Sequence, residues 1–260
     1  MAAPPAYAER APIPPLQNTV ACTWTGRLGD DGTPYVDRVL PDGCIDLIWD
    51  GSALFVAGPD TGPVPLAAAP GARYTGLRFR PGTAPAALGV PASELLDRRV
   101  DAADVIGAAA ARELAGWLHE DDGQPAVLEA AVAGWLAARD PGHRPDPLVQ
   151  GVVRALAAAP TADVGVGRLA ADLGVSERQL HRRCTAALGY GPKTFGRIAR
   201  FRRFLALAEA RRQPRSLGQL AASAGYADQA HLARECRRLA GATPSALVSV
   251  PFKTGAAHPA

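Results

Sequence analysis

The chain has 260 residues and a formal net charge of +3, which divides into −8 over residues 1–146 and +11 over residues 147–260. This length accommodates two domains, each with its own core, and the divided charge indicates that only the C-terminal half meets a polyanion. Every apolar stretch of 18 residues is interrupted by charge, and no basic-then-apolar leader begins the chain, so we expect neither a membrane span nor a signal peptide.

The N-terminal half predicts a small β-rich domain with a helical extension, over residues 21–139. Residues 1–20 precede it as a proline-rich lead-in, which we expect to be extended or poorly ordered. Turns are expected at Pro41–Gly43 and Gly58–Asp60. The apolar runs of strand length are Val36–Leu40, Cys44–Trp49, Ala53–Ala57 and Tyr74–Phe79, and helical spacing follows over Pro91–Leu96, Ala102–His119 and Pro125–Ala138.

A linker and a helical domain follow. Residues 140–147 are polar and contain three prolines, which is typical of a linker. Residues 148–250 predict seven helices, and residues 251–260 are left as a tail. The predicted helices are Leu148–Ala159, Val164–Leu173, Ser176–Leu188, Pro192–Arg211, Leu217–Ala224, Asp228–Leu239 and Pro244–Val248. The overall prediction is an α+β chain, with a small β-rich N-terminal domain and helical extension, then an all-α, seven-helix tandem helix-turn-helix domain.

The strongest feature of the sequence is a repeated turn pattern in the helical half. Arg168–Pro192 and Gln219–Pro244 each contain a helix, a short turn with glycine and a second helix, at an offset of 51 to 52 residues. Capping boxes are expected at Ser176 and at Ser216, because each is followed three residues later by Gln. Two such units can place two reading helices on one face of double-stranded DNA, so we predict a transcription factor.

The residues opposite the apolar face of each second helix are the candidates for reading bases. They are Glu177, Arg178, His181, Arg182 and Thr185 in the first unit, and Gln229, Ala230, Ala233, Arg234 and Arg237 in the second. Arg can form a bidentate pair with guanine, and Gln with adenine. Lys193 and Arg197 begin the connecting helix and are candidate phosphate contacts, with Ser176 at the preceding cap. Glu177 and Glu235 could instead orient a neighbouring Arg.

These motifs resemble the AraC/XylS family of bacterial transcription regulators over about Leu148–Val248. In that family both reading helices enter consecutive major grooves, which implies that the base readers are Arg178, His181, Arg182, Gln229, Ala233 and Arg234. The segments Pro41–Trp49, Ala57–Pro63 and Gly76–Gly82 resemble an uncharacterised β-rich domain found ahead of AraC-type domains.

Sites of other chemistry are not expected. Cys184 and Cys236 occupy equivalent positions, which favours small core residues over redox sensors. Asp42, Cys44, Asp46 and Asp60 could be considered a metal cluster, but turn residues and a strand start explain them better. Together with Cys22, these residues make up the four cysteines of the chain, and none forms a CxxC motif, so we expect reduced thiols in the cytoplasm. We also expect no cofactor, no metal and no catalytic residue.

Three functions remain open from the sequence. The first is a sequence-specific regulator whose N-terminal domain senses an effector or dimerises. The second is a DNA-targeted enzyme with a catalytic N-terminal domain, and the third is a sequence-independent architectural DNA binder. For a regulator, RNA polymerase, a small-molecule effector and a second copy of the chain are further candidate partners, and no membrane is expected. Trp117 and Trp135 could serve an interface, or they could simply pack in the core.

Overall fold

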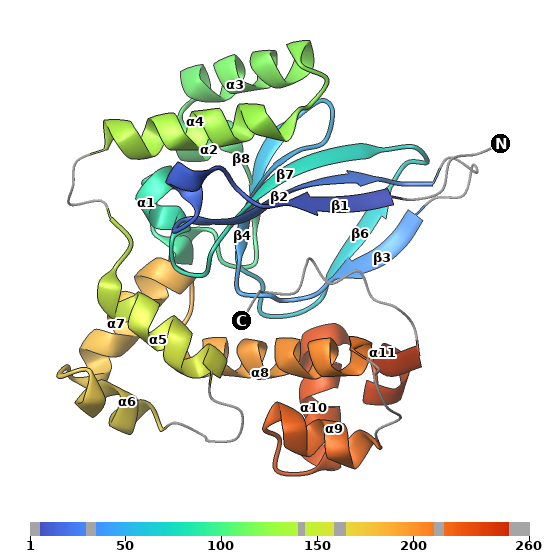
Figure 1. Ribbon diagram of the computed structural model, residues 1–260, viewed down its shortest axis with the longest axis vertical. Helices are drawn as coiled ribbons and strands as arrows, with labels where there is room; N and C mark the ends of the chain where they lie inside the picture. The colour runs from blue at the N-terminus through green and yellow to red at the C-terminus, as the bar shows by residue number, and fades with distance from the viewer. Residues whose placement is uncertain (1–5, 30–34, 140–143, 159–164, 211–215, 250–260) are drawn as a thin grey trace.

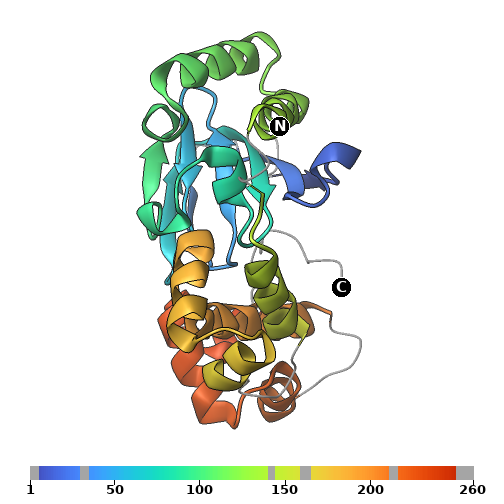
Figure 2. The same cartoon turned by 90° about the vertical axis from the view of Figure 1, so that its left-hand side faces the viewer.

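A computed structural model describes residues 6–29, 35–139, 144–158, 165–210 and 216–249. The molecule has two lobes, an N-terminal lobe built on a β-sheet and a C-terminal lobe of helices (Figure 1). A view turned by 90° shows the two lobes stacked along the longest axis of the molecule (Figure 2). Helix α3 (Ala108–Glu120) lies at the end farthest from the C-terminal helices. This architecture confirms the predicted α+β class.

The N-terminal lobe is organised by a six-stranded antiparallel sheet with strand order β1-β2-β7-β4-β5-β8. Its strands are β1 (Ala6–Arg10), β2 (Val20–Arg27), β4 (Ile45–Trp49), β5 (Leu54–Ala57), β7 (Arg73–Phe79) and β8 (Arg99–Asp101). A separate two-stranded sheet joins β3 (Tyr35–Val39) to β6 (Val64–Ala68). Every second residue of the central strands β4 and β7 faces the core of the lobe. Leu47, Leu77 and Phe79 belong to this core and are fully buried.

Helices cover one face of this sheet. Helix α4 (Pro125–Ala138) contacts β7 and β2, and α3 packs on α4. The single helix expected over Ala102–His119 is divided into α2 (Ala102–Ile106) and α3, because Gly107 adopts a φ of 88° that helical backbone cannot have. Two short elements complete the lobe, α1 (Ala84–Leu88) and the 3-10 helix η2 (Ala92–Glu94).

The lead-in is more ordered than its prolines suggest. Ala6–Arg10 forms edge strand β1, and Pro14–Leu16 forms the 3-10 helix η1. Leu16 is buried in the sheet core. The buried carboxylate of Glu129 on α4 accepts hydrogen bonds from Arg10 and from the Ile13 amide. Of the prolines in the described residues, Pro12 lies in the connection between β1 and η1, and Pro14 and Pro15 begin η1. The expected lead-in is therefore extended over β1 and ordered as a 3-10 helix over η1.

The C-terminal lobe contains the seven predicted helices, within one or two residues of the expected bounds. They are α5 (Pro147–Ala158), α6 (Val166–Asp172), α7 (Glu177–Leu188), α8 (Pro192–Glu209), α9 (Leu217–Ala224), α10 (Gln229–Ala240) and α11 (Pro244–Ser249). Both predicted capping boxes are present, at Ser176 and Ser216. The helices α7, α9 and α10 end at glycines in the left-handed conformation, as the sequence predicts.

Cys184 and Cys236 are fully buried in the C-terminal core, which confirms the predicted packing role. Burial raises the pKa of the Cys184 thiol to about 11 and that of Cys236 to about 12. Both thiols are therefore protonated and unreactive near neutral pH.

The two lobes are packed against each other rather than held only by a linker. Leu40, from the N-terminal half, is buried within the C-terminal core cluster. The side chain of Gln150 on α5 donates to the carbonyl of Pro81. Residues 140–143 of the predicted linker lie outside the described residues. Within the rest of it, Asp146 forms an ion pair with Arg183 on α7, and Pro147 is the first residue of α5.

Within the described residues, no helix is both long enough and apolar enough to span a membrane.

Candidate nucleic-acid interface

The first reading helix, α7, presents its predicted base readers to solvent. Leu180 and Cys184 turn inward, which leaves Arg178, His181 and Arg182 exposed on the outer side of the helix. A recognition helix contacts bases with residues near its N-terminus, and all three lie in the first half of α7. The His181 ring also packs on Gly191, where an added Cβ would lie 2.7 Å from the ring.

The second reading helix, α10, repeats this arrangement. Leu232 and Cys236 are buried, while Gln229 and Arg234 are exposed and Ala233 is half-buried. Asp228 caps the helix by accepting a hydrogen bond from the His231 amide. Arg182 and Arg234 lie six residues after the caps Ser176 and Asp228, so these two exposed arginines occupy equivalent positions in the two units.

Helix α8 connects the two units and is tied to the second by an ion pair. Arg197 donates two hydrogen bonds of 2.8 Å to the carboxylate of Glu235 on α10. This pair accounts for Glu235, which was expected to orient an arginine. The pair engages the Nε and Nη2 of Arg197, which gives this residue a structural role, and a phosphate contact there stays a prediction. Lys193, in the first turn of α8, is exposed and keeps its predicted assignment.

Ser176, the third predicted phosphate contact, is exposed but already bonded. Its hydroxyl accepts from the Gln179 amide and donates to the Gln179 side chain, as the capping box requires. The Ser176 amide donates to the same side chain. The local structure thus gives Ser176 a role in starting α7, and a phosphate contact there stays a prediction.

Two protein families match the chain. Residues 8–101 match a domain of unknown function (DUF6597), and residues 169–249 match a family described as a helix-turn-helix domain. The second match spans both turn units and the connecting helix.

The helical lobe is an AraC-type helix-turn-helix domain. The chain is accordingly a DNA-binding transcription regulator.

Comparison with solved structures gives matches over part or most of the chain. A probable AraC family transcriptional regulator from Rhodopseudomonas palustris is 24% identical, over 40% of this chain and 96% of that one, with a TM-score of 0.37. ToxT from Vibrio cholerae is 10% identical over 87% of this chain and 97% of its own, with a TM-score of 0.45. ToxT with a bound unsaturated fatty acid gives 10% identity, 84% and 91% coverage, and a TM-score of 0.45. No curated protein matches this chain.

Away from the AraC-type domain, the N-terminal sheet carries a cavity of about 230 Å³. One part of its wall is apolar and aromatic, formed by Trp24, Leu28, Ile48, Phe55, Leu66 and Tyr74. The remaining part is charged and includes Arg38, Asp42, Asp46, Asp60, Arg78 and Arg99. A mostly apolar wall with a few convergent polar groups is the usual composition of a small-molecule site.

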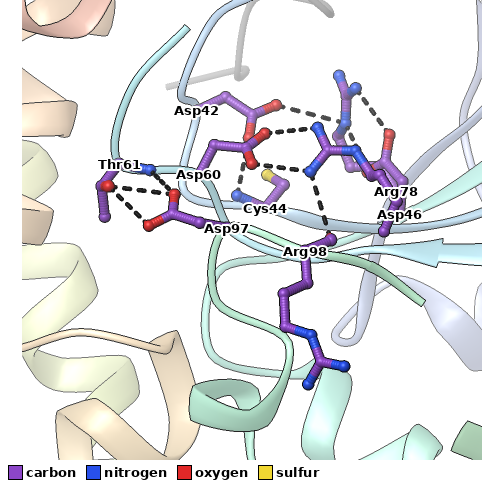
Figure 3. Close-up of polar contacts among 9 residues, drawn as sticks. Asp42, Cys44, Asp46, Asp60, Thr61, Arg78, Asp97 and Arg98 are labelled. Carbon is purple, nitrogen blue, oxygen red and sulfur yellow. Dashed lines mark hydrogen bonds and ion pairs between the residues drawn. The ribbon is translucent and has the colours of Figure 1, made fainter. Parts of the chain in front are cut away.

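The charged wall is held by two arginine–aspartate pairs. Arg78 donates to both carboxylate oxygens of Asp46, at 3.0 and 2.9 Å, and Arg99 donates to those of Asp60, at 2.8 and 2.7 Å. Asp42 lies 3.5 Å from Arg78 and also accepts from the Cys44 amide (Figure 3). The three aspartates of the possible metal cluster, Asp42, Asp46 and Asp60, are therefore engaged by arginine side chains or by a backbone amide.

In the charged wall, burial and ion pairing shift the pKa values of Asp46 and Arg78 in opposite directions. The pKa of Asp46 is raised above its ordinary value, because burial outweighs the lowering effect of the nearby Arg78 guanidinium. Burial likewise lowers the pKa of Arg78, but the carboxylates of Asp46 and Asp42 raise it well above its ordinary value. Arg78 therefore stays charged, and its pairing stabilises the ionised form of Asp46. Among the described residues, no group of three or more His, Cys, Asp or Glu is placed to hold a metal ion.

The arginines of the cavity were missed by sequence reasoning. Asp46 and Arg78 are direct cross-strand partners of β4 and β7, so the signal exists but needs the strand register. Arg99 was missed because β8 is only three residues long.

Proposed function

We propose that this regulator binds specific DNA sequences by placing α7 and α10 in successive major grooves, and that its N-terminal domain senses a small molecule in the cavity of the sheet. The observation that carries the first part is the exposure of Arg182 and Arg234 at equivalent positions of α7 and α10, with Arg178 and Gln229 exposed nearer the start of each helix. Arginine and glutamine side chains near the start of each helix have the hydrogen-bonding groups that distinguish base pairs in the major groove.

The division of charge supports this assignment of the two halves. The acidic N-terminal half, at −8, repels phosphate, whereas the C-terminal half, at +11, attracts it. The cavity supports sensing over a purely dimerising role, because it combines aromatic and charged walls. Of the two tryptophans considered for an interface, Trp135 packs against the sheet core, and Trp117 is 45% exposed on α3.

The expected footprint on a preferred operator has two contact blocks, with centres about 10 bp apart on one face of the duplex. This spacing follows from two reading helices in one chain entering consecutive turns of the major groove. Hydroxyl-radical footprinting of the full-length protein on sites selected from genomic fragments measures it. A single short block, or equal binding to random duplex, would contradict the proposal and favour an architectural binder.

Replacing Lys193 with Ala is expected to weaken binding to specific and random DNA alike. An exposed lysine at the start of α8 supplies a phosphate contact without sequence information. The slope of log K against log salt should shrink by about one unit. Titrations at several salt concentrations measure this slope, and Arg112→Ala on exposed α3 provides a control with the same change of charge. A Lys193→Ala slope equal to that of the control would remove Lys193 from the interface.

A further inference from the structure

We propose that loop 58–63 and Arg38 form a brace that fixes the spacing of the two helix-turn-helix units and couples it to the cavity in the N-terminal sheet. This inference goes beyond the proposed function in that it concerns spacing within the chain, and its test requires no DNA. The brace reaches the C-terminal ends of both reading helices, which are the ends away from their predicted base readers.

At the first unit, the brace contacts the end of α7. Gly189 ends this helix with a φ of 88°, and an added Cβ there would lie 2.7 Å from Cγ of Pro59. The same Cβ would lie 3.2 Å from the carbonyl oxygen of Ala92 in η2. The close approach of the N-terminal lobe therefore requires glycine at this position.

At the second unit, the brace contacts the end of α10. Arg38 donates a hydrogen bond of 3.0 Å to the Ala240 carbonyl, and a longer one of 3.4 Å to Gly241. Pro63 approaches from the other end of the loop, since a Cβ on Gly241 would lie 3.7 Å from its Cγ. The last carbonyls of a helix lack partners within the helix and carry partial negative charge, so a guanidinium is well matched to them.

The loop between these contacts is firmly attached to its own lobe. The Gly58 amide donates to the Arg98 carbonyl at 2.9 Å, and Gly58 packs so closely on the Leu95 carbonyl that a Cβ would overlap it. Thr61 donates from its amide and its hydroxyl to the carboxylate of Asp97 (Figure 3). A loop held at both of these points transmits a displacement instead of absorbing it.

The brace also forms part of the cavity wall. Arg38, Gly58 and Asp60 line the cavity, and Asp60 is held there by the bidentate pair with Arg99. A molecule that displaces the Asp60–Arg99 pair therefore acts on the loop that spans α7 and α10. Helix α8 and the Arg197–Glu235 pair join the two units on their own side, so the brace is a second connection between them.

Spin labels can measure the spacing directly. Ala171 on α6 and Ala222 on α9 are exposed, and they occupy equivalent positions 51 residues apart in the two units. The double variant Ala171→Cys/Ala222→Cys can be labelled selectively, because the four native cysteines are buried. Double electron–electron resonance on the full-length protein then reports the distance distribution between the units.

Two variants and a matched control separate the parts of the proposal. Arg38→Gln removes the contact with α10, and Asp60→Ala cuts the pair in the cavity wall. Arg73→Gln serves as the control, because Arg73 is on β7 and its side chain is 68% exposed. We expect Arg38→Gln and Asp60→Ala each to broaden and shift the distribution, and Arg73→Gln to leave it unchanged. Circular dichroism establishes that each variant is folded, and Arg99→Gln replaces Asp60→Ala if the latter is not.

The outcomes are distinct. A distribution unchanged by Arg38→Gln overturns the brace, because α8 alone then fixes the spacing. A response to Arg38→Gln without one to either cavity variant overturns the coupling to the cavity. Since no DNA is present, neither result depends on whether the protein recognises a specific operator.

Discussion

Replacing Arg78 with Met is expected to lower the free energy of unfolding by about 3–5 kcal/mol, because it leaves the buried carboxylate of Asp46 without its ion-pair partner. The Arg78 side chain is 13% exposed and that of Asp46 is 10% exposed. The Asp46 side chain would retain the hydrogen bond of 3.1 Å from Trp24 and lose both hydrogen bonds from Arg78. Urea denaturation followed by tryptophan fluorescence measures the change.

Two further variants identify the cause of this loss. Arg73→Met, on the same strand but exposed, should change stability by less than about 0.5 kcal/mol. The double variant Asp46→Asn/Arg78→Met should recover part of the lost stability, because it removes the unpaired carboxylate together with the arginine. If the double variant is no more stable than Arg78→Met alone, the lost packing of Arg78 is the cause instead of the unpaired charge.

The second large effect is expected on DNA binding. Arg182→Ala and Arg234→Ala should each weaken binding to a preferred operator by about 1–3 kcal/mol and relax specificity at one position. Both side chains are exposed near the start of their helices, where a bidentate pair with guanine can form. Because they belong to different units, the two losses should add to within about 0.5 kcal/mol in the double variant.

Competition titrations with operator and random duplex test these expectations. Arg112→Ala removes the same charge from the exposed face of α3 and should leave the ratio of specific to random binding unchanged. If Arg182→Ala weakens both duplexes equally, Arg182 contacts phosphate and is not a base reader. A strongly non-additive double variant would indicate that the units do not bind as separate contacts.

The helical lobe could be predicted closely because its signals are local. Each of these signals acts within one or two helical turns. They are a capping residue with Gln three positions later, apolar residues spaced three to four positions apart, and a terminal glycine. Ser176 and Gly189 therefore mark the ends of α7 without knowledge of any distant contact. The pairing of Arg197 with Glu235 could not be predicted in this way, because Glu235 lies 38 residues away and is brought near by the packing of α10 on α8.

The sheet and its cavity could be predicted only in part. The apolar runs of β4 and β7 are visible in the sequence, but the cavity wall depends on strand order, since β7 lies between β2 and β4. Edge strand β1 was missed because its residues alternate weakly and prolines follow it. The turns at 41–43 and 58–60 were predicted as connections. Both turns also approach the C-terminal helices: an added Cβ on Gly43 would lie 3.0 Å from the Phe195 ring on α8, and Pro59 packs at the end of α7. These contacts result from tertiary packing that no local pattern reveals.

The position of Leu40 has a consequence for how the protein is made. This residue belongs to the N-terminal half, yet it completes the core around Val149, Leu188 and Phe195. Chains are synthesised from the N-terminus, and domains begin to fold as they emerge from the ribosome. Leu40 therefore lacks these core partners until the helices of the C-terminal half have been synthesised, and the nascent N-terminal sheet carries an apolar residue whose folded environment comes from the later half of the chain.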